Sequence, residues 1–221
     1  PSDYGYDASN FETRFGESYF EDFVRDHDPA DVLRELIQNE YDAGGTRMEV
    51  RFAQDEMIVK GNGDPIDEPG WNRLSVSMGT GNISGSDESI QAKISSIGSK
   101  NAGLRSLWLF GDFIDIKSDG KKTGLFYPTK TLRTPEVDSG SRGKRGVTIR
   151  VPYRAKNRGR LTAFTASKQE QAFKQFGEEL ASVVLKLAQP DERKSLNNIR
   201  VTSDLRGREI HWRQSARMLE D

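Results

Sequence analysis

The stretch from Asp28 to Val59 constrains the fold more than any other, because it places a helix directly before a strand pattern. Asp28-Pro29 is typical of a helix start, since Asp accepts hydrogen bonds from free backbone N–H groups and Pro suits the first helical position. Apolar residues recur at helical spacing until Gly44-Gly45, which favours a helix end. Apolar and charged residues then alternate over 48–52, as in a half-buried strand. We therefore expect a helix over 29–43 that packs against a sheet.

The remaining patterns repeat this order of helix and strands, which indicates an α+β protein. Glu68-Pro69-Gly70-Trp71 is typical of a second helix start, and a loop rich in Gly and Ser follows it. The other expected elements are a short helix over 102–108, strands over 113–117, 123–127 and 147–151, a helical stripe over 173–187, and a final hairpin of 199–202 with 209–212.

Three regions follow from these patterns. Residues 1–28 are expected to form an N-terminal arm, polar and aromatic without a clean period. Residues 29–190 carry the main domain, with a mobile loop at about 75–100. Residues 191–221 hold the strand hairpin, which belongs to the domain or leads out of it. We find no internal repeat and no linker that divides the chain.

Composition excludes several classes of site. The 221 residues include no cysteine, so neither a disulfide framework nor a thiolate metal site can form. The two histidines, His27 and His211, lie far apart in sequence, which disfavours a zinc site. No apolar run approaches the roughly 20 residues that span a bilayer. We therefore expect no contact with a membrane and a cytoplasmic location.

Charge is unevenly spread, although the net charge is only −1. The segment 3–42 is acidic, and Arg142–Arg160 is strongly basic. Such a segment can bind the phosphates of a nucleic acid, and it can equally be a solvated surface loop. Tyr153 is its one aromatic residue, so a platform for stacking bases is not evident.

A polar stripe lies on the first expected helix. Glu35, Asn39 and Asp42 are spaced by four and three residues, which brings them to one face. An amide oxygen can bind Mg²⁺, which keeps most of its waters, and a nearby carboxylate can orient or deprotonate an attacking water. The alternative is an ordinary amphipathic helix with a polar outer face.

Two segments rich in small residues accompany this stripe. Gly61–Ile66 follows a strand directly, and its glycines permit close approach of a ligand to the backbone. Ile97–Ser106 opens a helix whose free N–H groups suit a phosphate, and Lys100 adds a cation. Taken singly, each is also explained as a turn or a helix cap.

Together, in this order and spacing, the segments resemble the motifs of the GHKL ATPase superfamily, which has the Bergerat fold. Residues 33–43 look like its N box and are the most specific match. Gly61–Ile66 looks like the first glycine box, 98–106 like the second, and 145–151 like the strand that closes the pocket. The stretch 64–71 is reminiscent of the sacsin-like, heat-shock-protein-90-like branch.

The resemblance implies a two-layer sandwich, in which a mixed β-sheet is covered by helices on one face. It also implies that the mobile loop at about 75–100 is a lid over the nucleotide. It implies a chaperone-like hydrolase that binds ATP with Mg²⁺, hydrolyses it slowly, and acts as a conformational switch within a larger multidomain protein or with a dimer partner. Glu35 would be the general base and Asn39 the residue that holds Mg²⁺. The nucleotide contacts that it implies are Asn39, Asp42, Ala43, Asn62, Gly63, Asp64, Ile66, Gly98, Ser99, Lys100, Asn101, Ala102, Gly103, Leu104 and Thr148.

The sequence departs from the usual family pattern where the base is read. The family usually carries an Asp at the start of the first glycine box, and this chain has Gly61, with Pro65 in place of the second glycine. Val147 stands where a Thr usually follows the glycine of the closing strand, and Thr148 should face the other side of that strand. Asn101 takes the place of a glycine. The phosphate and Mg²⁺ positions thus match better than the base-reading positions, and a degenerate scaffold that binds a protein partner is the alternative.

Overall fold

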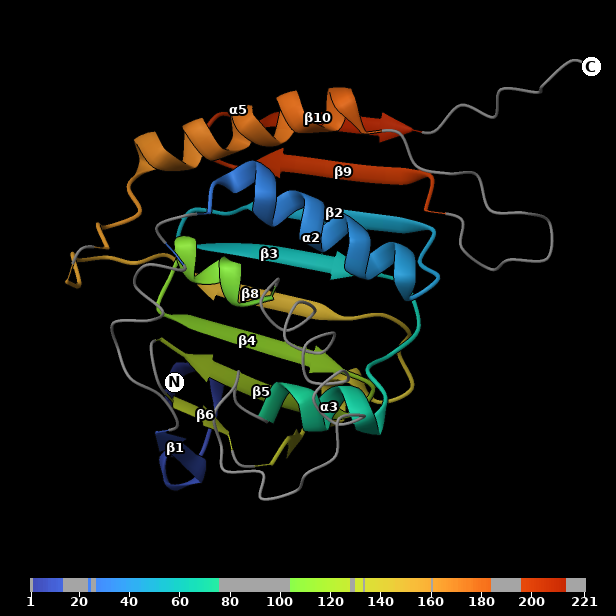
Figure 1. Ribbon diagram of the computed structural model, residues 1–221, viewed down its shortest axis with the longest axis vertical. Coiled ribbons are helices and arrows are strands. Elements are labelled where there is room, and N and C mark those ends of the chain that lie inside the picture. Colours follow the sequence, from blue (N-terminus) through green and yellow to red (C-terminus); the bar gives the residue numbers. More distant parts are fainter. Residues whose placement is uncertain are drawn as a thin grey trace, which may run out of the picture.

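One mixed β-sheet forms the frame of the protein (Figure 1). The computed structural model describes residues 2–13, 24, 27–75, 104–127, 130–132, 134–159, 161–183 and 196–213. Within these residues the sheet has ten strands, in the order β1-β6-β5-β4-β8-β3-β2-β9-β10, with β7 paired to β5. The strands are β1 (Phe11–Thr13), β2 (Arg47–Phe52), β3 (Glu56–Gly61), β4 (Phe113–Ser118), β5 (Lys121–Phe126), β6 (Lys130–Leu132), β7 (Glu136–Val137), β8 (Thr148–Pro152), β9 (Asn198–Ser203) and β10 (Arg208–Arg213).

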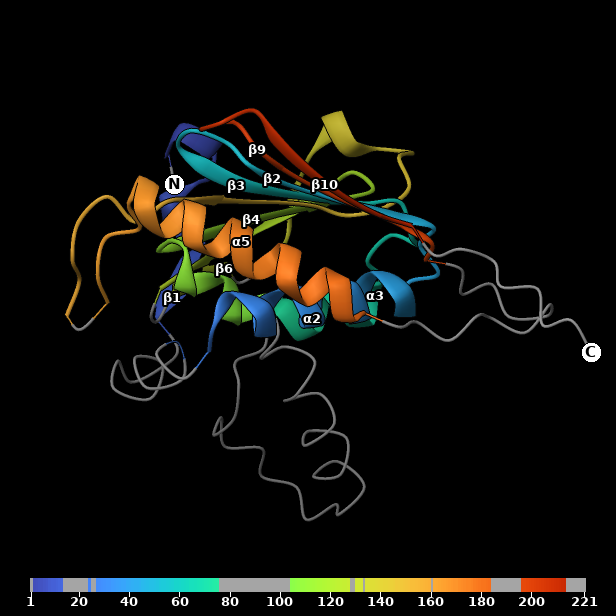
Figure 2. The ribbon, with the colours of Figure 1, turned by 90° about the horizontal axis from the view of Figure 1, so that it is seen from above.

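The helices α2 (Pro29–Asp42), α3 (Glu68–Ser75) and α5 (Ala166–Ser182) cover one face of this sheet (Figure 2). Short 3-10 helices complete the described elements: η1 (Ser2–Tyr4), η2 (Ala8–Asn10), η3 (Ser106–Leu109) and η4 (Ser139–Ser141). Along β2 the residues alternate strictly between exposed and buried. The sheet therefore buries one face under the helices, and the expected α+β layering is confirmed.

Helix α2 forms where its capping signal predicts. The backbone N–H of Asp31 donates to Asp28 Oδ1 at 2.9 Å, and the Asp31 carboxylate accepts from the Asp28 N–H, so the two residues form a capping box. Gly44 has φ +67°, a left-handed conformation that favours glycine and ends the helix. The buried face of α2 consists of Val32, Leu33, Leu36, Ile37 and Glu40.

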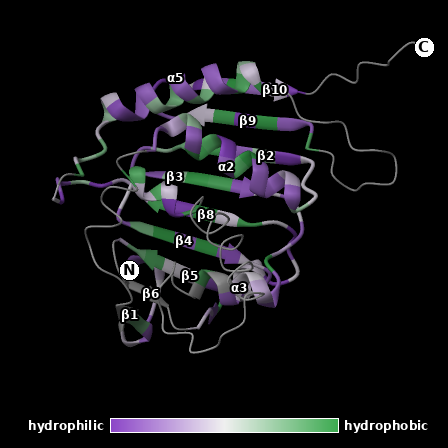
Figure 3. Ribbon diagram, in the orientation of Figure 1, coloured by the Kyte–Doolittle hydropathy of each residue, from purple (hydrophilic) through white to green (hydrophobic). Residues whose placement is uncertain are grey.

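A row of apolar side chains crosses the sheet beneath the helices. Register pairs Val201 with Val50, Val50 with Val59, Val59 with Ile149, and Ile149 with Ile116. All five side chains are buried. Figure 3 shows the apolar residues along β9, β3 and β4 that continue this core. Burial of this row joins strands that lie far apart in sequence.

Both ends of the chain add strands to the same sheet. β9 runs parallel to β2, and β10 pairs antiparallel with β9, so the final hairpin is part of this sheet. At the other edge, β1 pairs with β6, and the Tyr6 hydroxyl donates to Asp115 and to the Thr123 carbonyl oxygen. The expected lid, apart from Ser75, lies outside the described residues. No described helix is long and apolar enough to cross a membrane.

Phe52 of β2 packs against α5, and removal of its side chain should destabilise the fold. Its ring is fully buried and meets Phe110, Phe173 and Phe176 edge to face. We expect Phe52→Ala to lower the free energy of unfolding by about 3–5 kcal/mol, measured by urea denaturation. Leu205→Ala, in the exposed β9–β10 turn, is the control and should change it by less than about 0.5 kcal/mol. Equal losses in the two variants would contradict this assignment of the core.

Candidate functional site

A cavity of about 540 Å³ opens on the helical side of the sheet, where α2, α3 and the start of β8 meet. Its wall is mostly apolar, and polar groups enter it from α2 and from the loop after β3. The apolar lining includes Met48, Val59, Ile66, Leu74, Val147 and Ile149. An apolar wall with a few convergent polar groups is typical of a site for a small organic ligand.

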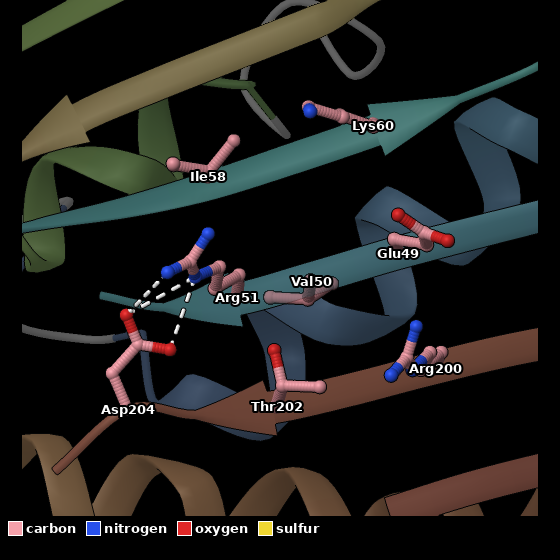
Figure 4. Close-up of a pocket in the computed structure, with 8 residues that line it drawn as sticks. All are labelled: Glu49, Val50, Arg51, Ile58, Lys60, Arg200, Thr202 and Asp204. Atoms are coloured by element: carbon pink, nitrogen blue, oxygen red, sulfur yellow. Dashed lines mark hydrogen bonds and ion pairs between the residues drawn. The ribbon is translucent and has the colours of Figure 1, made fainter. Parts of the chain in front are cut away.

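A second hollow lies on the opposite, outer face of the sheet (Figure 4). Charged side chains of both signs line it. Within the lining Arg51 pairs with Asp204 at 2.7 Å, and Arg200 pairs at 2.8 Å with Glu209, which lies outside the lining. Such exposed pairs are typical of a solvated sheet surface. The cavity on the helical side is therefore the stronger candidate site.

The polar stripe of α2 meets this cavity at its C-terminal end. Asn39, Asp42 and Ala43 line the cavity, and Glu35 lies one helical turn before Asn39, half-buried and outside the lining. The Asn39 Nδ2 atom is buried, and it has no hydrogen-bond partner among the described residues. A buried amide without a partner is costly, so this group fits a site that a polar ligand completes.

Glu40 is the residue of the site that the sequence reasoning missed. Its side chain is 8% exposed, and it lines the cavity. Glu40 Oε1 accepts hydrogen bonds from the backbone N–H groups of Asn62, at 2.7 Å, and Gly63, at 2.8 Å. Burial raises the pKa of the Glu40 carboxyl, and these two hydrogen bonds oppose that rise. One signal was available: Glu40 follows Ile37 by three residues, which puts a charge on the buried helix face.

Two glycines make room for this carboxylate. A Cβ atom added at Gly61 would overlap Glu40 Oε2, and one added at Gly45 would overlap Glu40 Oε1. The expected Asp position at the start of the first glycine box is therefore filled in space by a carboxylate from the helix. Any side chain at residue 61 would displace it.

The loop 61–66 is held by its own polar groups. Asn62 Oδ1 accepts from the N–H groups of Thr46 and Arg47, at 2.8 and 2.9 Å, so its side chain fixes the turn and lies outside the cavity lining. Gly63 approaches Ala43 closely and contributes its N–H to Glu40. Asp64 and Ile66 do line the cavity. Of the four expected loop contacts, Asp64 and Ile66 thus line the cavity, whereas Asn62 and Gly63 stabilise the loop beside it.

The start of β8 meets the cavity with alternate residues. Val147 and Ile149 line the cavity, whereas Thr148 does not. Successive strand residues point to opposite faces, and Thr148 pairs in register with the exposed Lys60. Thr148, an expected nucleotide contact, therefore lies outside the cavity lining and on the opposite face of the sheet.

The second glycine segment is described only at its end. Gly98, Ser99, Lys100, Asn101, Ala102 and Gly103 lie outside the described residues, and Leu104 lines the cavity. The next residue, Arg105, is fully buried, and none of its three side-chain nitrogens has a hydrogen-bond partner in the described part of the chain. Burial lowers the pKa of Arg105 to about 10. Its guanidinium lies 5.8 Å from the centre of the Trp108 ring.

Three arginines of the basic segment Arg142–Arg160 pair with acidic side chains. Arg145 pairs with Asp64 at 2.6 Å. Arg150 Nε donates to Glu56 at 2.9 Å. Arg154 is buried, and it binds Asp112 at 2.6 Å. These acidic partners come from other parts of the chain. The positive charge of the segment is therefore partly neutralised, although its sequence alone suggests that it is unopposed.

No group of three or more His, Cys, Asp or Glu side chains that could hold a metal ion occurs in the described ranges. A Mg²⁺ ion here would therefore rely on Asn39, on water and on ligand oxygens, which is a common way for Mg²⁺ to bind.

Comparisons with known proteins add information on the fold. No family model matches the chain, and no curated protein matches it. Among solved structures, the N-terminal domain of a DNA repair protein is similar, with a TM-score of 0.52 and 16% sequence identity. The match covers 89% of this chain and spans 57% of that chain. At this identity the likeness concerns the fold alone.

The burial of Glu40 predicts a pH-dependent effect of its replacement. Because its folded-state pKa is raised, the carboxyl stabilises the fold below its ordinary pKa of 4.5, and this contribution is lost as pH rises through the folded value. Gln keeps the acceptor oxygen and carries no charge. We expect Glu40→Gln to raise Tm at pH 7.5 and to change it little at pH 4, measured by calorimetry.

Glu178→Gln removes an exposed carboxylate of α5 and is the matched control. It should show no gain that grows with pH. A lower Tm for Glu40→Gln at pH 7.5 would show that the ionised carboxylate stabilises the fold, contrary to this expectation.

Proposed function

We propose that this chain is a GHKL-type nucleotide-binding domain, which binds ATP with Mg²⁺ and hydrolyses it slowly. The observation that carries the proposal is Asn39. Its buried amide lacks a described partner, and it lies at the junction of a polar helix face and an apolar cavity. That junction is flanked by the loop 61–66, in the motif order that the resemblance requires.

The cavity suits the two halves of a nucleotide. Its apolar wall, which includes Val59 and Ile149, fits the flat face of a base. Asn39 would hold Mg²⁺ through its amide oxygen, and the Nδ2 atom would then donate to the ligand. When bound, Mg²⁺ neutralises charge on the phosphates.

Glu35 is the proposed general base. It lies four residues before Asn39, so the two side chains share one helix face. Its carboxylate would accept a proton from the attacking water, whose oxygen forms a bond to the terminal phosphorus while the bond to the ADP oxygen breaks. The products are ADP and inorganic phosphate.

Arg105 supports the presence of an anion near this end of the site. A buried guanidinium without a partner is strongly unfavourable, and an anionic ligand would offset that cost. Arg105 directly follows Leu104, which lines the cavity. We therefore propose that the phosphates lie near Leu104. The resemblance to the second glycine box implies that residues 98–103 contribute to their binding.

The domain would act as a switch within a larger protein or with a dimer partner. Nucleotide binding would change the population of conformations and thus the contacts with that partner. The scaffold alternative differs in one measurable respect, because it binds no nucleotide. The nucleic-acid alternative depends on Arg142–Arg160, a segment in which three arginines pair with acidic groups of the same chain.

Nucleotide binding tests the site directly. We expect titration calorimetry with Mg²⁺ and ADP or a non-hydrolysable ATP analogue to give binding that Asn39→Ala weakens at least about tenfold, since a lost metal or charged hydrogen-bond contact contributes about 1.5–3 kcal/mol. Gln38→Ala is the matched control, because Gln38 is an exposed neighbour on the same helix. Equal affinity in both variants would remove Asn39 from the site.

Hydrolysis tests the role of Glu35. We expect Glu35→Gln to slow release of phosphate from ATP by about 100-fold or more, because a positioned general base contributes that much, while affinity for the analogue stays within about threefold. Glu178→Gln should leave the rate unchanged. A Glu35→Gln variant that hydrolyses ATP at the original rate would exclude Glu35 as the base.

A further inference from the structure

The Oε2 atom of Glu40 has no structural role in the described part of the chain. Oε1 accepts both backbone hydrogen bonds, from Asn62 and Gly63. Oε2 lies over Gly61, and it accepts no hydrogen bond from any described residue. Because Glu40 lines the cavity, this second oxygen is available to a ligand.

The surroundings of this oxygen define what it can recognise. An ionised carboxylate only accepts hydrogen bonds, so it favours an N–H donor and repels a carbonyl oxygen. Val59 and Ile149, which line the same cavity, offer no polar side-chain atom. A ligand edge with one N–H donor group on an otherwise apolar ring fits this arrangement.

We propose that Glu40 is the specificity-determining residue of the cavity, and that its Oε2 atom reads the 6-amino group of an adenine base. The inference rests on the proposed nucleotide binding. It assigns the reading of the base to a helix residue, although the resemblance would place that role at residue 61, where this chain has Gly.

Adenine fits better than guanine. A carboxylate that reads guanine uses both oxygens, one for each of two neighbouring N–H groups, and Oε1 is already occupied by two backbone donors. Guanine also carries a carbonyl oxygen at position 6, which would face the Oε2 atom. A single free acceptor oxygen matches the single amino group of adenine.

The space at Gly61 does not admit a carboxylate side chain at residue 61 together with the carboxylate of Glu40. A Cβ at residue 61 would overlap Glu40 Oε2, so an acidic side chain at 61 requires a smaller residue at 40. A structural clamp alone would need only Oε1, and Gln would supply that atom equally well. Base selectivity therefore separates the recognition role from a merely structural one.

The first experiment compares ADP with inosine diphosphate, in which a carbonyl replaces the 6-amino group, and with GDP. We expect the unaltered chain to prefer ADP to either by at least about tenfold in titration calorimetry, as one charge-assisted hydrogen bond implies. Glu40→Gln should reduce this preference to within about threefold, because an amide both donates and accepts.

The second experiment moves the carboxylate. Gly61→Asp alone should abolish binding of ADP, and Glu40→Ala alone should remove the preference for ADP over inosine diphosphate. The double variant Glu40→Ala/Gly61→Asp should again bind ADP at least about tenfold more tightly than inosine diphosphate. Thermal unfolding of each variant verifies that it is folded.

The outcomes separate the two proposals. Binding of ADP and inosine diphosphate with equal affinity, a preference for GDP, or an unchanged preference in Glu40→Gln would overturn the role of Glu40 and leave nucleotide binding intact. Failure of the folded chain to bind any of the three nucleotides with Mg²⁺ would overturn the proposed function and this inference with it.

Discussion

The helical side of the molecule depends on a buried carboxylate held by two backbone N–H groups. Removing Glu40 from water is unfavourable, and the hydrogen bonds from Asn62 and Gly63 offset part of that cost. The same bonds fasten the loop after β3 to the end of α2. A further hydrogen bond, from the Asp64 N–H to the Ala43 carbonyl oxygen at 2.7 Å, reinforces this junction. The position of the cavity's polar edge thus follows from one side chain that links a helix to a loop.

The opposite edge of the cavity depends on the close approach of two strands. Gly146 has φ +88°, and a Cβ there would overlap the Gly61 carbonyl oxygen, so glycine is required. The Ser118 hydroxyl donates to the Gly146 carbonyl oxygen and accepts from the Ile66 N–H, both at 3.0 Å. The loop 61–66 is therefore fixed from α2 on one side and from Ser118 of β4 on the other. Few of its backbone groups are free to move, so a ligand would meet a preformed edge.

The sequence predicts those features whose causes are local. Asp28, Pro29 and Gly44 determine the limits of α2 through capping and left-handed backbone, and alternation determines β2. Pairings between distant segments, such as β9 with β2, leave no local pattern. The basic segment is misleading for the same reason, since the acidic partners of Arg150 and Arg154 come from other elements. Within the site, the Asn39 face is predictable from spacing. The role of Glu40 is not, because it depends on space that a glycine 21 positions later leaves open.

Several costly features gather around one cavity, and this convergence is the physical argument for a ligand. Burial disfavours the ionised form of Glu40. Among the described residues, the Asn39 Nδ2 atom has no hydrogen-bond partner, and neither has the guanidinium of Arg105, which follows the lining residue Leu104. At Asn39 and Arg105, stability alone would favour apolar residues, because a buried polar group without a full set of partners weakens the fold. Glu40 and Asn39 line the cavity, so a ligand that carries both an N–H donor and negative charge would satisfy these two groups directly. A mononucleotide has both, with the donor on the base and the charge on the phosphates, whereas a purely apolar ligand would leave each of these costs in place.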